Sequence, residues 1–255
     1  MNLQVLGCAG GIGGRERHTT CLRLDNDILL DAGTGLTSLN LEQLAAIDHI
    51  FITHSHLDHV AGLALLIDAI QTKRSLPVTV YATEPVLTIL KKHLFNWALW
   101  PDFTEIPTKE KTLLRLKAIE PGSEIELNGR VILPYSVNHT SGSVAYWIHN
   151  HTSGFLFTGD LASTPELWKA LAQEKKLSKV IVDCSFPNSE AALAAKSFHF
   201  CPQSLLDDIQ AMPYSVDFLI YHLKPGQEDL IMNELEAMKG ARLIRAITRG
   251  DEFIF

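Results

Sequence analysis

Four potential metal ligands lie within six residues in the stretch Thr53-His54-Ser55-His56-Leu57-Asp58-His59. An apolar run, Ile50-Phe51-Ile52, precedes this stretch, and another apolar run follows it. Polar groups at this density are costly in a protein core, because each buried one needs a partner. A metal would supply that partner, and the rest of the chain would then have to carry the remaining ligands.

The spacing within this stretch predicts how its side chains face an ion. If the chain stays extended after Thr53, His54 and His56 point to the same side, because the side chains of a strand alternate. Asp58 comes where the next helix is expected to start, a position that aspartate favours. His59 then lies in the first helical turn and faces another direction. The stretch can therefore offer two imidazoles to one ion, and a carboxylate with an imidazole to a second.

Three further candidate ligands come directly after apolar strands elsewhere in the chain, namely His139, Asp160 and His222. Ligands at strand ends converge in space even when they lie far apart in sequence. A mixture of nitrogen and oxygen ligands suits Zn²⁺ and also allows Mn²⁺ or Fe. The sequence therefore predicts a site for two divalent metal ions.

Strands and helices alternate over both halves of the chain. This interleaving, with no linker between the halves, predicts two sheets with helices outside them, built as one domain spanning residues 1–255. A hairpin is predicted around Asp25-Asn26-Asp27, a favourable turn sequence. Helices are predicted at residues 36–47, 61–70, 84–99, 165–173, 202–212 and 227–239.

The composition is typical of a soluble folded enzyme, with 255 residues, 46% of them apolar and 20% charged. No apolar run approaches the ~18 residues of a membrane span, and the first residues lack the basic region of a signal peptide. We therefore expect no membrane contact. The four cysteines are widely scattered, which is typical of free thiols in a reducing compartment and predicts a cytoplasmic location. The formal charge of −7 argues against binding to long nucleic acid.

Other features allow more than one interpretation. The glycine-rich residues 10–14 could form a phosphate loop or a connection between strands, and they lack the Walker lysine. The aromatic residues between Phe95 and Phe103 could stack a nucleobase, line a dimer contact or pack against a helix. The histidines expected at the surface or in loops are His18, His49, His93, His149 and His151.

The His54-Ser55-His56-Leu57-Asp58-His59 motif and its three downstream partners resemble the metallo-β-lactamase superfamily of dinuclear hydrolases. The resemblance covers the whole chain. It implies an α+β fold, a four-layer αββα sandwich of two mixed sheets with helices outside and metals at one edge of the sheets. It also implies that one metal takes His54, His56 and His139, that the other takes Asp58, His59 and His222, and that Asp160 bridges them.

Within that superfamily, the local sequences are most similar to short bacterial relatives of the class II cyclic-nucleotide phosphodiesterases. The matching segments are residues 6–14, 53–67, 183–188 and 221–225. The resemblance implies hydrolysis of a 3′,5′-cyclic nucleotide to a nucleoside 5′-monophosphate by a metal-bridging hydroxide, with Asp58 accepting a proton. It further implies a small anionic nucleotide as substrate and a homodimer.

One segment departs from the family pattern. Members usually carry a Gly-His-Leu-Thr-Pro-like sequence where this chain has Phe198-His199-Phe200-Cys201-Pro202. We expect His199 to lie near the metals and either to protonate the leaving 3′ oxygen or to bind the phosphate, since a histidine can do both at neutral pH. The alternative is a surface histidine that flanks the following helix. Lys224 could likewise meet a phosphate or remain a solvated charge.

Three other functions remain open on the sequence alone. The same metal site could belong to a 3′ tRNA-processing endonuclease, although no basic insertion is present to grip RNA. It could serve a lactonase or another carboxyl-ester hydrolase, in which the metals polarise a carbonyl. A non-catalytic, metal-stabilised binding protein is the third alternative, and the filling of every ligand position argues against it.

Overall fold

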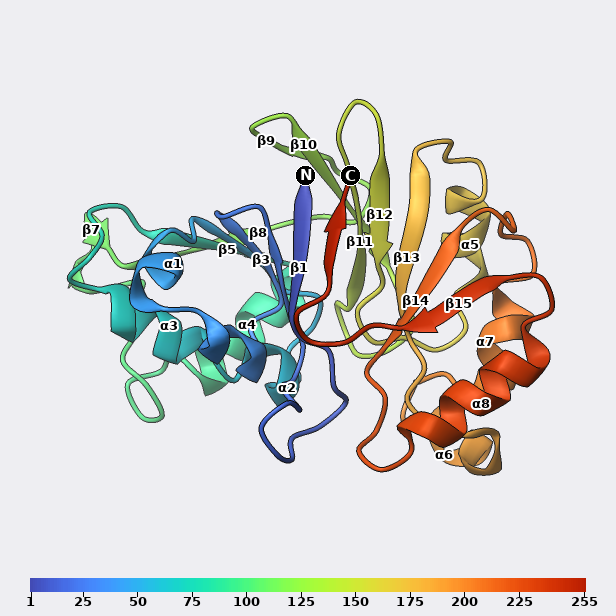
Figure 1. The fold of residues 1–255 in the computed structure, drawn as a ribbon. Helices are drawn as coiled ribbons and strands as arrows, with labels where there is room; N and C mark the ends of the chain where they lie inside the picture. Colours follow the sequence, from blue (N-terminus) through green and yellow to red (C-terminus); the bar gives the residue numbers. More distant parts are fainter.

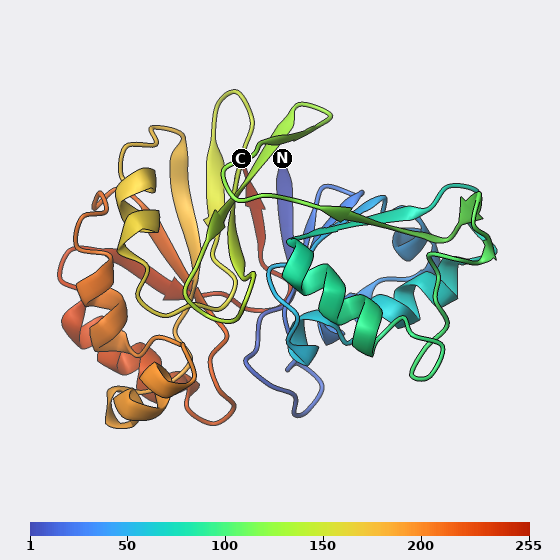
Figure 2. The same cartoon turned by 180° about the vertical axis from the view of Figure 1, so that it is seen from behind.

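A computed structural model describes residues 1–255, which form two seven-stranded sheets that face each other, with helices on both outer sides (Figures 1 and 2). The first sheet has the order β16 (Glu252–Ile254), β1 (Asn2–Gly7), β2 (Cys21–Leu24), β3 (Ile28–Leu30), β4 (His49–Phe51), β5 (Val78–Ala82) and β8 (Leu114–Ala118). The second has the order β15 (Leu243–Ala246), β14 (Asp217–Tyr221), β13 (Leu177–Asp183), β12 (Gly154–Phe157), β11 (Val144–His149), β10 (Arg130–Ser136) and β9 (Ile125–Leu127).

Both sheets are mixed in the same way. In the first sheet, β16, β1, β2 and β3 pair antiparallel, whereas β3, β4, β5 and β8 pair parallel. In the second, β9 to β12 pair antiparallel and β12 to β15 pair parallel. A separate hairpin joins β6 (Pro107–Thr108) to β7 (Lys111–Thr112). The parallel strands matter for function, because the loops that follow them open at the same edge of a sheet.

The helices form the two outer layers (Figure 1). Those beside the first sheet are η1 (Thr34–Ser38), α1 (Leu41–Ala45), α2 (Leu57–Val60), α3 (Leu63–Ile70) and α4 (Glu84–His93). Those after β12 are α5 (Pro165–Leu171), η2 (Asn188–Glu190), α6 (Ala191–Lys196), α7 (Pro202–Asp208) and α8 (Glu228–Met238). None of these helices has the length and apolar character needed to cross a membrane.

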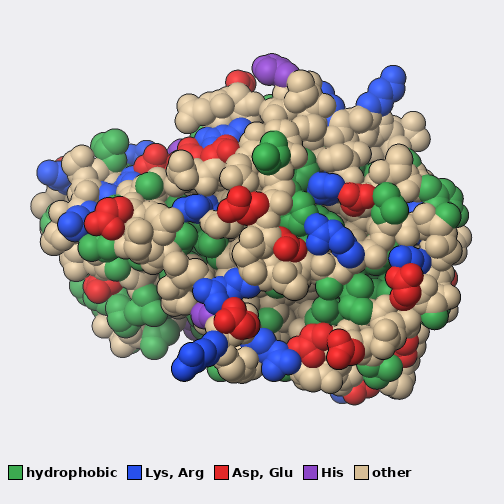
Figure 3. Space-filling model, in the orientation of Figure 1, with side chains coloured by type: hydrophobic (Ala, Val, Ile, Leu, Met, Phe, Trp, Pro, Cys, Tyr) green, Lys and Arg blue, Asp and Glu red, His purple; other side chains and the backbone are tan.

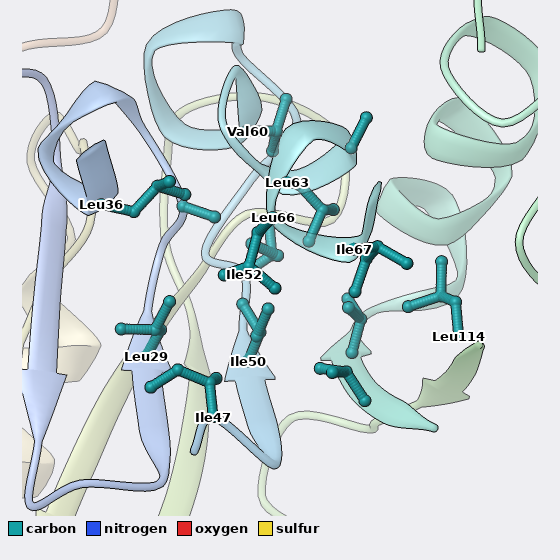
Figure 4. Close-up of a cluster of buried hydrophobic side chains, with 14 of the residues drawn as sticks. Leu29, Leu36, Ile47, Ile50, Ile52, Val60, Leu63, Leu66, Ile67 and Leu114 are labelled. Atoms are coloured by element: carbon teal, nitrogen blue, oxygen red, sulfur yellow. The ribbon is translucent and has the colours of Figure 1, made fainter. Parts of the chain in front are cut away.

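Three buried layers hold this sandwich together. Between the two sheets, Phe51 of β4 packs with Tyr146 of β11 in a cluster of 20 buried residues. Outside the first sheet, α3 buries an apolar stripe at helical spacing that includes Leu63 and Ile67, and Figure 4 shows these side chains turned toward Ile50 of β4. A third cluster packs α5, α7 and α8 on the second sheet. The predicted four-layer α+β sandwich is confirmed.

Three predicted helices differ from the structure, and the smallest difference is that the helix expected at 202–212 ends at Asp208. The helix expected at 36–47 is divided into η1 and α1, because Asn40 caps α1 by accepting a hydrogen bond from the Gln43 backbone N–H at 2.9 Å. The helix expected at 84–99 ends at His93, because the Asn96 side chain ties the following loop into a turn and Trp97 adopts a left-handed backbone (φ 64°).

The predicted hairpin around Asp25-Asn26-Asp27 is confirmed, and its turn is bound by an arginine from the other sheet. The guanidinium of Arg130 on β10 donates to both carboxylate oxygens of Asp27 (2.6 and 2.7 Å) and to Asp25 (3.0 Å). Such a forked pair connects the two sheets at a point where Arg130 is buried.

Arg130→Met is expected to lower the free energy of unfolding by about 1.5–3 kcal/mol, the contribution typical of hydrogen bonds to charged groups. Urea unfolding followed by circular dichroism measures this change. Arg115→Met is the matched control, because Arg115 is exposed on β8, and its effect should stay within about 0.5 kcal/mol. Equal effects of the two substitutions would contradict a connecting role for Arg130.

Candidate metal centre

The loops after β4, β10, β12 and β14 bring all seven predicted ligands to one place. The first group of side chains is His54, His56, His139 and Asp160, and the second is Asp58, His59, Asp160 and His222. Within each group the candidate ligand atoms lie within 4.8 Å of one another. Asp160 belongs to both groups. The structure therefore has the geometry of two adjoining groups that share one carboxylate, the arrangement that the family resemblance implies.

One unsatisfied atom shows that this cluster suits a cation. His54 is fully buried, and its Nε2 has no hydrogen-bond partner. The other ring nitrogen, Nδ1, donates to the Thr53 hydroxyl at 3.0 Å, so Nε2 carries a lone pair in the neutral ring. A buried polar atom without a partner costs free energy of about 1–3 kcal/mol. A metal ion beside Nε2 and the Asp160 carboxylate, 3.7 Å away, would remove that cost.

Three other imidazoles likewise contact a protein oxygen through Nδ1. The Nδ1 of His139 donates to the Phe198 carbonyl at 2.9 Å, and the Nδ1 of His222 contacts the Ser185 hydroxyl at 2.8 Å. The Nδ1 of His59 donates to a carboxylate at 2.7 Å. In the neutral rings, each Nε2 keeps a lone pair that could coordinate an ion. Without an ion these atoms contact other candidate ligands, such as His56 beside His139 (3.2 Å) and Asp58 beside His222 (3.1 Å).

Asp31 orients the histidines that follow β4. Its carboxylate accepts the His59 Nδ1–H and also accepts both the backbone N–H and the hydroxyl of Thr53 (2.8 Å each). The Thr53 hydroxyl in turn accepts from His54, so one carboxylate fixes two rings. Metal-binding histidines characteristically donate their second N–H in this way.

Asp183, at the end of β13, has the corresponding role in the second sheet. Its carboxylate accepts the His199 Nδ1–H at 2.7 Å and the Ser185 hydroxyl at 2.6 Å. Ser185 then accepts from His222, so that Asp183 orients one ring directly and a second through a hydroxyl. Asp31 and Asp183 thus hold the two halves of the centre from opposite sheets.

Asp160 is placed to stay ionised between the two groups. Its Oδ2 lies 3.3 Å from Nε2 of both His59 and His222, and its Oδ1 accepts the Tyr221 hydroxyl at 2.9 Å. Burial raises the pKa of Asp160, but the positive charges of His222 and His59 outweigh it and hold the pKa well below its usual range. A carboxylate that is both buried and charged is suited to bridging cations.

The backbone around the centre adopts unfavourable conformations. Asp31, Phe198 and His222 all have positive φ angles (57°, 57° and 62°), a region that costs a residue with a Cβ roughly 1–2 kcal/mol. Gly10 packs directly on His222, because a Cβ at Gly10 would lie 2.3 Å from the His222 carbonyl oxygen. The first of the glycine-rich residues 10–14 is therefore part of a close-packed connection after β1, and it supports His222.

His199 lies beside the centre, as the sequence predicted, and does not form a surface flank to α7. Its ring is 5.0 Å from that of His139 and is stacked 5.2 Å from that of His222. The other five histidines lie outside both groups, although His149 is half-buried against Trp147 because it ends β11. His49 is also half-buried and lies in β4, so the expectation of surface or loop positions was wrong for these two histidines.

The residues that orient the ligands were not identified from the sequence. Asp31 and Asp183 both come at the ends of buried strands, the same signal that selected Asp160. Applied to every carboxylate, that signal would have found them. Thr53, Ser185 and Tyr221 carry no such signal, because their hydroxyls become functional only through partners distant in sequence.

The profile of the β-lactamase superfamily domain matches residues 26–222. A 3′,5′-cyclic-nucleotide phosphodiesterase of Schizosaccharomyces pombe is 31% identical over 73% of this chain and 62% of its own length. A probable 3′,5′-cyclic-nucleotide phosphodiesterase of Yersinia pestis is 28% identical over 75% of this chain and 63% of its own length. The matched region is thus less than two thirds of either relative.

Solved structures show the same fold. Unliganded yeast PDE1 superposes with a TM-score of 0.85 over 100% of this chain and 99% of its own, at 19% identity. The matching profile includes all seven candidate ligands, and the two-sheet architecture agrees with the solved structure. The chain therefore belongs to the metallo-β-lactamase superfamily.

Proposed function

We propose that this chain is a phosphodiesterase that uses two divalent metal ions, most readily Zn²⁺, to hydrolyse a 3′,5′-cyclic nucleotide to a nucleoside 5′-monophosphate. The observation that carries the proposal is the pair of ligand groups that share Asp160, with the unpartnered His54 Nε2 pointing into one of them. The relatives named as cyclic-nucleotide phosphodiesterases in Schizosaccharomyces pombe and Yersinia pestis support the choice of substrate.

Metal ions bound here would supply an activated water and neutralise charge on the phosphoryl oxygens. Asp58 would orient that water and accept its proton. Burial raises the pKa of Asp58, but the hydrogen bond from His222 (3.1 Å) and the charge of His59 lower it below its usual range. The Asp58 carboxylate is therefore ionised at neutral pH, and it is accessible because 30% of its side chain is exposed.

His199 is suited to protonate the leaving 3′ oxygen. Its Nδ1 is bound to Asp183, and no protein group binds its Nε2. Burial lowers the pKa of His199, but the charge of Asp183 and their hydrogen bond outweigh it, so that the pKa lies above its ordinary value. A raised pKa increases the fraction of rings that carry, near neutral pH, the proton that the leaving alkoxide needs.

The distribution of surface charge supports a small substrate, and the free thiols support a cytoplasmic location. On the face shown in Figure 3, Lys and Arg are interspersed with Asp and Glu, which leaves no extended basic strip there for a nucleic-acid backbone. All four cysteines are free thiols, and three of them are buried, which supports a reducing compartment.

The proposed function is tested by turnover of the metal-reconstituted protein on 3′,5′-cyclic purine and pyrimidine nucleotides, with the product identified by chromatography. We expect a nucleoside 5′-monophosphate and no 3′-monophosphate. Lactones and a tRNA precursor serve as comparison substrates. Faster turnover of either comparison substrate, with no hydrolysis of any cyclic nucleotide, would contradict the proposal.

His199→Ala is expected to lower turnover by about 10²–10⁴-fold, the contribution typical of a general acid, with no loss of bound metal. Because the pKa of His199 is raised, the native rate should fall as pH rises through that pKa, and the variant should lack this decline. Turnover as a function of pH and metal content by mass spectrometry measure both effects. Exposed His93, replaced by alanine, is the control, and native kinetics in His199→Ala would rule out the role.

A further inference from the structure

Phe198 occupies a backbone position that glycine usually fills. Helix α6 ends at its cap Ser197, and Phe198 follows with φ 57°. The Phe198 N–H donates to the Ala195 carbonyl (3.4 Å), and the next N–H, that of His199, donates to the Ala194 carbonyl (2.9 Å). These two bonds form a Schellman ending, whose left-handed residue is most often glycine because a Cβ is unfavourable there. An aromatic side chain at this position therefore lowers stability.

Burial of the ring does not account for its presence. The Phe198 side chain remains 44% exposed and belongs to none of the buried hydrophobic clusters. The nearby Phe186 and Phe200, in contrast, each belong to one of those clusters. Strained residues that gain little from packing occur preferentially at binding and catalytic sites.

The backbone of Phe198 is hydrogen-bonded to a candidate ligand of the metal centre. Its carbonyl accepts the His139 Nδ1–H at 2.9 Å, and its neighbour is His199. The backbone that carries this exposed ring therefore lies at the rim of the centre. Leu57, between two candidate ligands in the first half of the chain, is 73% exposed at the same centre. Two large, exposed apolar residues are thus chain neighbours of residues at the metal centre, which suits a substrate with an aromatic part.

We propose that the nucleobase of the nucleotide stacks on Phe198 while its phosphate lies at the metal centre. This inference rests on the proposed nucleotide substrate. Every base has a face that can stack on an aromatic ring, and the larger purines stack over a greater area. Phe198 would therefore strengthen binding of purine nucleotides above all, and it would act on affinity and not on the proton transfers of the reaction.

The test compares two inhibitors that differ only in the base. AMP and ribose 5-phosphate compete with hydrolysis of bis(4-nitrophenyl) phosphate by the metal-loaded protein. We expect AMP to be the better inhibitor of the native protein. Phe198→Gly should raise the inhibition constant of AMP by about 5- to 10-fold, the lower part of the stacking range for one base on an aromatic side chain. The constant for ribose 5-phosphate should stay within about twofold of its native value.

Matched variants separate stacking from damage to the centre. Phe198→Tyr keeps the ring and should restore AMP affinity, whereas Leu230→Ala removes a side chain of similar exposure (48%) on α8 and should change neither constant. An unchanged AMP constant in Phe198→Gly, or an equal rise for both inhibitors, would overturn the inference. If cyclic AMP is not hydrolysed but Phe198→Gly weakens inhibition by AMP alone, the proposed function fails and the stacking site stands. If cyclic AMP is hydrolysed but Phe198→Gly does not weaken inhibition by AMP, only the stacking site fails.

Discussion

Asp160→Ala is expected to release at least one metal ion and to lower phosphodiesterase turnover by more than about 10³-fold. Asp160 is the one side chain common to both ligand groups, and it is fully surrounded by protein. Without its charge, two ions would lie close together with no shared carboxylate to offset their repulsion. The imidazoles of His59 and His222 would also lose the acceptor that lies 3.3 Å from each.

Metal content by mass spectrometry and turnover of bis(4-nitrophenyl) phosphate measure the two effects together. Asp160→Asn is an isosteric variant that keeps the side-chain volume and removes only the charge. It therefore separates the effect of the lost charge from that of a folding defect. Asp68→Ala is the matched control, because Asp68 is an exposed carboxylate on α3. A variant at position 160 that kept both ions and the native rate would show that Asp160 does not bridge.

Saturation of the metal-free protein with Zn²⁺ is expected to raise its thermal unfolding midpoint by about 8–16 °C. A ligand at about a thousand times its dissociation constant stabilises the folded state by about 4 kcal/mol, and a chain of this size gains about 2–4 °C per kcal/mol. The physical source is the cluster of candidate ligands, most of them buried, which includes the unpartnered Nε2 of His54. Differential scanning calorimetry with and without a chelator measures the shift.

This stabilisation should decrease as pH falls. Burial lowers the pKa of His59, but the charges of Asp160 and Asp31 raise it well above the ordinary value, so the ring is protonated in the metal-free protein. Metal binding must release that proton, and acid opposes the release. A midpoint that did not respond to Zn²⁺ at any pH between 6 and 9 would contradict metal binding by this cluster, and Asp160→Ala should abolish most of the response.

The two-sheet sandwich and the convergence of the seven candidate ligands could be predicted because their signals are local. The His54–His59 motif, short apolar strands and a polar residue after each strand are all visible in the sequence. The orienting contacts were not visible, since Thr53 reaches Asp31 and Ser185 reaches His222 only after the sheets have formed. Pairs of this kind depend on tertiary packing and leave no periodic pattern.

Helix boundaries were the least predictable part of the fold for a similar reason. The apolar spacing between residues 36 and 47 suits one helix, yet the Asn40 side chain begins a new one. In the sequence alone, Phe198 stands out only because it departs from the family pattern. Its left-handed backbone, which makes the side chain informative, results from the ending of α6, a helix that the apolar pattern did not predict.

Zinc titration of the metal-free protein, with turnover of 3′,5′-cyclic AMP as the readout, tests the two-ion phosphodiesterase most directly. Rate would be measured against equivalents of Zn²⁺ per chain, and the product would be separated by chromatography. We predict that the rate reaches its plateau at about two equivalents and that the product is 5′-AMP, because the two ligand groups share Asp160. Full activity at one equivalent, or no hydrolysis of cyclic AMP at any metal loading, would contradict the account.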